Sequence, residues 1–194
     1  MMDAIDLFAG CGGLSLGFIK AGYKIIKAVE FDESIANTYK ENHPEVEMIV
    51  DDIRNVDKAD FFYPGAAPDH VTGIIGGPPC QGFSMAGARI RRGFIDDPRN
   101  YLFKHYYNIV KRVKPKAFIM ENVKGMLTMQ QGKIFDEILR LFSSEKQMNG
   151  NPYHVYYKII KAVEFGIPQG RERLIIIGSQ KDVPFDEVWK LAKE

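Results

Sequence analysis

Short apolar runs alternate along this chain with longer segments whose apolar residues recur at helical spacing. The short runs are typical of buried strands and the longer segments of amphipathic helices. The pattern predicts strands at residues 4–8, 24–30, 47–50, 71–75, 117–121, 153–162 and 174–178. It predicts helices at residues 14–21, 33–42, 98–113, 133–143 and 185–192. Strands separated by helices favour an α/β fold with a mainly parallel sheet covered on both faces. The last two strands have no helix between them, which favours an antiparallel pair at the edge.

Length and charge limit what the molecule can be. A chain of 194 residues is predicted to form one domain. Its formal net charge is +1, so a nucleic-acid partner would be held by a local basic patch. No apolar stretch approaches the roughly 20 residues of a membrane span, and residues 1–8, with Asp3 and Asp6, do not resemble a secretory leader. The two cysteines, Cys11 and Cys80, lie in different predicted loops, which favours free thiols in a reducing cytoplasm.

A glycine-rich turn follows the first predicted strand. Gly10, Gly12 and Gly13 allow the backbone to approach a ligand closely, and a helix starting near Leu14 offers free N–H groups to a carboxylate or phosphate. A dinucleotide site would carry glycine at the third position of the motif, where this chain has Ser15. The turn therefore predicts a small-molecule site.

Acidic residues follow the next two strands. Glu30 ends the second strand and is suited to ribose hydroxyls of either a dinucleotide or S-adenosylmethionine. Asp52, in Asp51-Asp52-Ile53 after the third strand, would lie beside an adenine. Either acid can equally be a solvated loop carboxylate, so these residues alone leave the ligand open.

Cys80 lies in the segment Gly76-Gly77-Pro78-Pro79-Cys80-Gln81-Gly82-Phe83-Ser84, directly after an apolar run. Two glycines and two prolines would present its thiol on a stiff turn at a strand end, where a nucleophile can be aimed and held. The alternative is a structural cysteine, since free cysteine is usually an inert small hydrophobe.

Charged residues mark two other strand ends. Glu121 ends the strand expected beside that of Cys80, so it can reach the same pocket, and a raised pKa there would let it donate a proton. Arg171 and Arg173 alternate at the entry to the last strand, so both point to one side and suit a carbonyl, phosphate or carboxylate. The alternatives are a surface or N-capping carboxylate and a pair of solvent-facing edge charges.

Segment 83–99 combines glycines with arginines, a composition suited to a mobile lid that contacts phosphates. Its arginines are Arg89, Arg91, Arg92 and Arg99. A basic run is more often a solvated loop, but the position directly after Cys80 favours a lid. Phe103, Tyr106 and Tyr107 fall at helical spacing and are predicted to be core residues.

Four segments together resemble the cytosine-C5 DNA methyltransferase family, in the family's own order. They are the segment around Cys80, Asp6-Leu7-Phe8-Ala9-Gly10-Cys11-Gly12-Gly13, Phe118-Ile119-Met120-Glu121-Asn122-Val123 and Gln169-Gly170-Arg171-Glu172-Arg173. The resemblance implies a Rossmann-like S-adenosylmethionine-dependent methyltransferase fold, with a mainly parallel seven-stranded sheet and one reversed strand. It also implies methyl transfer to carbon 5 of a flipped cytosine in double-stranded DNA, within a restriction-modification system.

The resemblance also implies a role for each matching residue. Cys80 would add as a thiolate to carbon 6 of cytosine, because carbon 5 is too weak a nucleophile to take a methyl group directly. Glu121 would hold N3 and the exocyclic amine, and Arg171 and Arg173 would hold the base carbonyl and a phosphate or carboxylate. The residues implied around S-adenosylmethionine are Phe8, Gly10, Gly12, Gly13, Leu14, Glu30, Asp52, Ile53 and Pro78. Those implied to contact DNA are Gln81, Ser84, Arg89 and Arg99, and no metal site is predicted.

The resemblance runs from Ile5 to about Ser179 and ends at the family's eighth motif. We therefore expect residues 1–194 to form the catalytic and cofactor-binding domain, with the target-recognition region and final motifs absent; a second chain is one possible source of them. Three alternatives stay open. The first is a related transfer-RNA cytosine methyltransferase, although Gly82-Phe83-Ser84 resembles the DNA enzymes more closely. The others are a nicotinamide-dependent oxidoreductase, which leaves Cys80 and Glu121 unexplained, and a partial subunit that is inactive without a partner.

Overall fold

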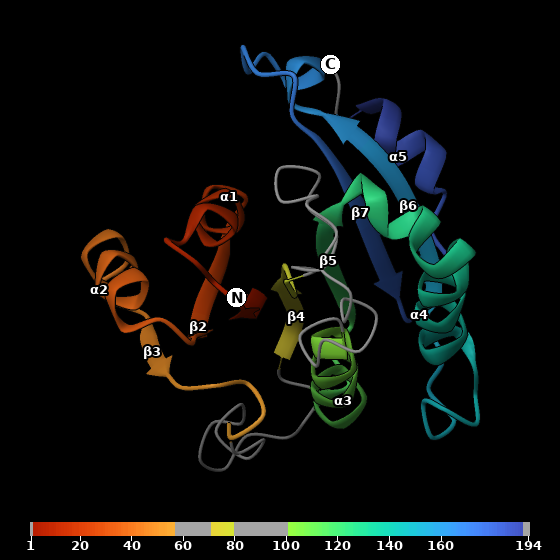
Figure 1. Cartoon of the computed structure of the whole chain (residues 1–194), viewed down its shortest axis with the longest axis horizontal. Coiled ribbons are helices and arrows are strands. Elements are labelled where there is room, and N and C mark those ends of the chain that lie inside the picture. The colour runs from red at the N-terminus through yellow and green to blue at the C-terminus, as the bar shows by residue number, and fades with distance from the viewer. Residues whose placement is uncertain (1, 57–70, 80–100, 192–194) are drawn as a thin grey trace.

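Seven strands form one sheet in the computed structural model, which describes residues 2–56, 71–79 and 101–191. Their order across the sheet is β3-β2-β1-β4-β5-β7-β6 (Figure 1). They are β1 (Met2–Leu7), β2 (Tyr23–Glu30), β3 (Glu47–Val50), β4 (Val71–Gly76), β5 (Ala117–Val123), β6 (His154–Lys161) and β7 (Glu172–Ser179). Neighbouring strands from β3 to β5 are parallel, whereas β7 is antiparallel to both β5 and β6. The predicted mainly parallel sheet with one reversed strand is confirmed.

Helices cover both faces of this sheet. The described helices are α1 (Gly13–Lys20), α2 (Glu33–Asn42), α3 (Leu102–Val113), α4 (Lys133–Ser143) and α5 (Phe185–Leu191), with 3₁₀ turns η6 (Lys124–Gly132) and η7 (Ala162–Phe165). Side chains alternate between the faces of a strand, so neighbours such as Ile74 and Ile75 belong to different buried clusters. In Figure 1, α1 and α2 lie beside the N-terminal strands, and α3 and α4 lie beside the other half of the sheet.

The larger cluster is aromatic and packs α3 and α4 against the sheet. Phe103, Tyr106 and Tyr107 are buried in it, which confirms their prediction as core residues. The Tyr106 hydroxyl lies 3.0 Å from the Ile74 carbonyl oxygen and 2.9 Å from that of Ile119, so it is shared between β4 and β5. A buried hydroxyl needs such a partner. The helix that follows the Cys80 segment is therefore anchored at the centre of the sheet.

Several element boundaries differ from the sequence predictions, most of them by one or two residues. The first strand ends at Leu7, because Phe8 has a positive φ of 59° and leaves the extended conformation. The fifth strand continues through Val123, because pairing with β7 extends as far as Arg173, so the prediction that Glu121 ends its strand is wrong. The third helix begins at Leu102, and residues 98–100 of the predicted helix lie outside the described ranges. No helix in the described ranges is long and apolar enough to span a membrane.

Candidate active site

The carboxyl ends of β1, β2, β3 and β4 open onto one cavity of about 510 Å³. Parallel strands end at the same edge of a sheet, and ligands of open α/β sheets bind at that edge. The cavity is lined by Phe8, Val29, Glu30, Phe31, Asp32, Ile35, Asp51, Asp52, Ile53, Arg54, Gly77, Pro79 and Leu102. It therefore brings together residues from four strand ends and from the start of α3.

Four of the predicted cofactor residues, Phe8, Glu30, Asp52 and Ile53, line this cavity. Gly10 is joined to the same site by a hydrogen bond from its N–H to Glu30 Oε2, 2.9 Å long. Among the described residues, those lining the cavity do not include the other four of that set: Gly12, Gly13, Leu14 and Pro78. Three of these four form the turn into α1, and the fourth follows β4.

Glu30 organises the rim of the cavity through both of its carboxylate oxygens. Oε2 accepts from Gly10, and Oε1 accepts from the N–H groups of Phe31 at 2.9 Å and Asp32 at 3.0 Å. Each carboxylate oxygen has two lone-pair positions, so one position, on Oε2, remains for a further donor. The carboxylate is thus held in place and can still accept a hydroxyl group of a ligand.

Asp52 is oriented by Arg54. The Arg54 Nε and Nη2 groups donate to the two carboxylate oxygens at 2.9 and 2.6 Å, a bidentate pair. This hydrogen bonding holds the pKa of Asp52 below its ordinary value. Asp52 faces the cavity as a fixed anion, which suits an amino group of a ligand.

An exposed aromatic residue was missed by the sequence reasoning. Phe31 directly follows Glu30, lines the cavity and leaves 71% of its surface exposed. A large apolar side chain at a cavity rim offers a flat surface on which a ring can stack. The signal that could have identified it is its position, since it directly follows the strand-end acid.

A buried carboxyl group lies beneath the glycine turn. Asp6, on β1, accepts a 2.6 Å hydrogen bond from the Ser15 hydroxyl through Oδ2, and its Oδ1 has no hydrogen-bond partner among the described residues. Burial raises the pKa of Asp6 to about 7; hydrogen bonds from Ser15 oppose the rise and the charge of Glu30 adds to it. Burial, and to a lesser extent the charge of Asp6, raises the pKa of the nearby Tyr39 and Tyr106 hydroxyls. The carboxyl group is therefore poised to titrate near neutral pH.

This burial predicts a pH-dependent stability. Below about pH 4 Asp6 is protonated in the folded and unfolded chains alike, so it adds no pH dependence. Between about pH 4 and pH 7 the unfolded chain releases the proton while the folded chain keeps it, so rising pH favours unfolding, by up to about 4 kcal/mol in total. We expect Asp6→Asn to flatten the decline in unfolding free energy between about pH 4 and pH 7, measured by urea denaturation.

The exposed Asp186 provides the control for this measurement, since Asp186→Asn removes a carboxyl group that the solvent already hydrates. That variant should keep the slope of the parent chain. Equal slopes for Asp6→Asn and the parent would contradict the assignment of the pH dependence to Asp6.

A second polar cluster adjoins the cavity at Gly77. Arg173 Nε lies 2.6 Å and Arg171 Nη2 lies 3.8 Å from Glu121 Oε1, so both arginines face the same carboxylate, as their alternation predicts. Glu121 Oε2 lies so close to Gly77 that a Cβ there would stand 2.9 Å from it. Gly77 is therefore the contact between the cavity wall and the Glu121 carboxylate.

Asn122 fixes the turn that follows β4. Its buried amide donates to the Pro78 carbonyl oxygen at 2.8 Å, which ties the Gly77–Pro79 turn to β5. Glu121 and Asn122 are neighbours on one strand, so one faces Gly77 and the other holds Pro78. Cys80, Gln81, Ser84, Arg89 and Arg99 follow this turn and lie outside the described residues.

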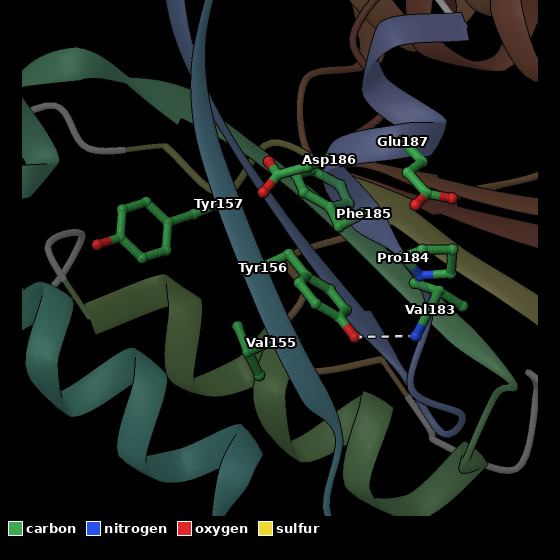
Figure 2. A pocket seen from close by; sticks show the side chains of 8 residues that line it. All are labelled: Val155, Tyr156, Tyr157, Val183, Pro184, Phe185, Asp186 and Glu187. Carbon is green, nitrogen blue, oxygen red and sulfur yellow. Dashed lines mark hydrogen bonds between the residues drawn. The ribbon is translucent and has the colours of Figure 1, made fainter.

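A second hollow, of about 560 Å³, lies between β6 and the segment that leads into α5. Figure 2 shows Tyr156 facing Phe185 there, while Tyr157 lies on the other side of β6. The Tyr156 and Phe185 rings stack with centroids 5.0 Å apart, and the Tyr156 hydroxyl accepts from the Val183 N–H at 3.0 Å. None of the described residues that line it was predicted as a site residue, and its contacts hold α5 against the edge strand.

Comparison with known proteins agrees with this architecture. A family model described as C-5 cytosine-specific DNA methylase matches residues 2–193. The Type II methyltransferase M.NgoPII of Neisseria gonorrhoeae is 43% identical over 94% of this chain and 49% of its own length. The Type II methyltransferase M.DdeI of Desulfomicrobium norvegicum is 42% identical over 96% of this chain and 42% of its own length.

A solved structure shares the fold. It is a putative DNA modification methyltransferase encoded within a prophage of E. coli, with a TM-score of 0.77 and 32% identity over 96% of this chain and 50% of that protein. The chain thus spans about half the length of the curated relatives that it matches.

Proposed function

The chain belongs to the C-5 cytosine-specific DNA methylase family, and we propose that it carries the catalytic part of a DNA cytosine-5 methyltransferase. The observation that carries this proposal is the shared wall at Gly77, where the cavity meets the Glu121 carboxylate and its two arginines. A methyl donor in the cavity and a base beside Glu121 would then be neighbours. Relatives named Type II methyltransferases support a restriction-modification role.

The cavity suits S-adenosylmethionine, which supplies a methyl group activated on a sulfonium. Glu30 would accept a ribose hydroxyl at its remaining lone-pair position, because three backbone N–H groups already fix its carboxylate at the rim. Asp52 would accept from the adenine amino group, and Phe31 and Ile53 would pack against the ring. We propose that the glycine turn, including Gly12, Gly13 and Leu14, and the nearby Pro78 complete this site around the amino-acid end of the ligand.

Cys80 is proposed to be the nucleophile. Its thiolate would add to carbon 6 of cytosine, which makes carbon 5 able to attack the methyl group; loss of the carbon 5 proton and release of the thiolate then restore the ring. Asn122 holds Pro78, two residues before Cys80, so β5 positions the approach to the nucleophile.

Glu121 is proposed to hold N3 and the exocyclic amine of the flipped base, where it can move a proton. Arg173 orients that carboxylate through the 2.6 Å contact, and the more exposed Arg171 is available to the base carbonyl. We assign these different roles to the two arginines because 52% of the Arg171 side chain is exposed, against 24% for Arg173.

Double-stranded DNA is the proposed substrate, and Gln81, Ser84, Arg89 and Arg99 are proposed to contact it. Phosphate contacts position a protein without choosing a sequence. We propose that choice of the target sequence rests on residues outside this chain, either in the rest of a longer polypeptide or in a second chain. The length of the relatives, about twice the matched region, supports this division.

Glu30→Ala tests the cofactor site. Removing the carboxylate deletes the proposed ribose contact and the anchor of the Gly10 N–H, so we expect binding of S-adenosylhomocysteine to weaken by about 10- to 100-fold. Isothermal titration calorimetry on the purified chain measures the change.

Glu41→Ala is the matched control, because Glu41 is an exposed acid of α2 that does not line the cavity in the described part of the chain. Its affinity should equal that of the parent. Preferential binding of NAD by the parent chain would instead support the oxidoreductase alternative.

A further inference from the structure

The end of α2 is joined to the glycine turn by three side chains. The Asn42 amide donates to the Cys11 carbonyl oxygen at 2.9 Å, and His43 Nε2 lies 3.0 Å from the Gly12 carbonyl oxygen. The Tyr39 hydroxyl lies 2.8 Å from the Ser15 hydroxyl, which in turn reaches Asp6. We call Tyr39, Asn42 and His43 the α2 clamp. Its contacts run to successive parts of the turn, from residue 11 to the first turn of α1.

The clamp fits the turn closely. His43 is 4% and Tyr39 is 0% exposed, and their rings pack at 4.8 Å between centroids. Gly12 has a φ of 88°, and a Cβ at Gly12 would collide with the His43 ring. Only glycine combines this backbone conformation with the close approach of the ring. The Gly12 carbonyl is therefore held against α2 by both geometry and a hydrogen bond.

The clamp fixes the direction of the peptide groups together with the first hydrogen bond of α1, in which the Leu16 N–H donates to the Gly12 carbonyl oxygen at 2.9 Å. In a trans peptide the N–H points opposite to the carbonyl, so turning the Cys11 and Gly12 carbonyls toward α2 turns the Gly12 and Gly13 N–H groups away from it. Gly12 N–H closes the turn onto the Ala9 carbonyl at 3.0 Å. Gly13 begins α1, where N–H groups have no acceptor inside the helix and remain available to a ligand.

The other end of α2 belongs to the cavity. Asp32 caps the helix by accepting from the Ile35 N–H at 3.0 Å, and its own N–H donates to Glu30. Glu30 also accepts from the Gly10 N–H, so Glu30 contacts both the start of α2 and the glycine turn. The end of α2 contacts the same turn. A distortion of α2 would therefore disturb both Glu30 and the glycine turn.

We propose that the α2 clamp is a positioning device that holds the glycine turn in its ligand-binding conformation before the cofactor arrives. Tyr39, Asn42 and His43 act through the backbone of residues 11–15 and are positioning residues. The inference rests on the proposed function, since it names what prepares the turn for the amino-acid end of the cofactor. Preorganisation of this kind lowers the cost of binding.

His43 offers the most direct test, because its ring and its N–H donor can be removed in separate variants. A carbonyl oxygen only accepts, so Nε2 must carry the hydrogen in the contact with Gly12. His43→Phe keeps a ring against Tyr39 and removes the donor, whereas His43→Gln removes the ring and keeps an N–H donor. We expect His43→Phe to weaken binding of S-adenosylhomocysteine about tenfold and His43→Gln to stay within about threefold of the parent.

Amide hydrogen exchange in the ligand-free chain provides a readout that does not depend on the cofactor. In His43→Phe and in Asn42→Leu, exchange of residues 9–14 should accelerate about tenfold while exchange of β5 and β7 stays at the parent rate. Asn151→Leu is the matched control, because the Asn151 amide also donates to a backbone carbonyl, that of Asn149, in an exposed turn. It should change neither measurement.

The outcomes separate the two proposals. Unchanged exchange of residues 9–14 in His43→Phe overturns the clamp, and a His43→Gln variant as impaired as His43→Phe refutes the role of the His43 hydrogen bond in it. Faster exchange throughout the sheet also overturns it, since that would be a general loss of stability. A parent chain that binds no S-adenosylhomocysteine contradicts the proposed function, and exchange then still decides whether α2 fixes the turn.

Discussion

Replacing Cys80 by serine is expected to abolish methyl transfer, with a loss of at least about 10³-fold in the rate. The proposed mechanism needs a thiolate, and thiols, whose pKa is near 8.5 when free, become thiolates at neutral pH where N–H groups or cations lie nearby. A serine hydroxyl is far less acidic, so it cannot supply the attacking anion. Transfer of labelled methyl groups to DNA by the complete methyltransferase measures the loss.

A covalent adduct gives a second readout of the same residue. DNA that carries 5-fluorocytosine lacks the proton whose loss releases the enzyme, so it should trap the parent as a species that survives denaturing electrophoresis. Cys11→Ser is the control for the adduct, because Cys11 is the other cysteine and its thiol is exposed. An adduct that persists in Cys80→Ser would refute the assignment. Efficient labelling of transfer RNA in place of DNA would favour the RNA enzyme instead.

The order of elements could be predicted from the sequence because strands and helices leave local periodic signals. Residues 33–42 and 133–143 form helices with the predicted bounds. The position of β7 between β5 and β6 could not be predicted in this way, since it depends on contacts between distant segments. Gly178 illustrates the limit: glycine usually weakens a strand, yet here a Cβ would collide with the ring of Phe118, its partner across β5.

The candidate site likewise contains some residues that could be predicted from the sequence and others that could not. Glu30 and Asp52 could be predicted because they lie at or just after strand ends, which parallel strands bring to one edge, whereas Phe8 and Ile53 were implied by the family resemblance. The side chains that hold the turns of the site in place could not be predicted. Their partners lie far away in the sequence: Asn42 and His43 hold a turn 31 residues earlier, and Asn122 holds Pro78 across 44 residues. Asp6 alone left a signal, since a charge inside a buried strand is costly unless it is partnered.

Glu121→Gln is expected to lower kcat for methyl transfer by about 10²- to 10³-fold. Glutamine keeps the length of the side chain and an oxygen that can accept from Arg173, so the contact at 2.6 Å can persist. What is lost is the carboxyl group that can take up and return a proton at the cytosine ring. Because Glu121 touches the cavity wall at Gly77 and is not itself a described cavity residue, KM for S-adenosylmethionine should change little.

Glu172→Gln makes the same change on the neighbouring antiparallel strand and serves as the matched control. Glu172 pairs with Lys124 at 3.0 Å and Lys161 at 3.8 Å, so its carboxylate belongs to a different ion-pair cluster from Glu121. Its loss should leave kcat within about threefold of the parent, since exposed ion pairs contribute little. Steady-state rates over a range of DNA and S-adenosylmethionine concentrations separate the two variants. If Glu121→Gln raised KM for DNA and preserved kcat, Glu121 would be a binding group for the flipped base and would have no part in proton transfer.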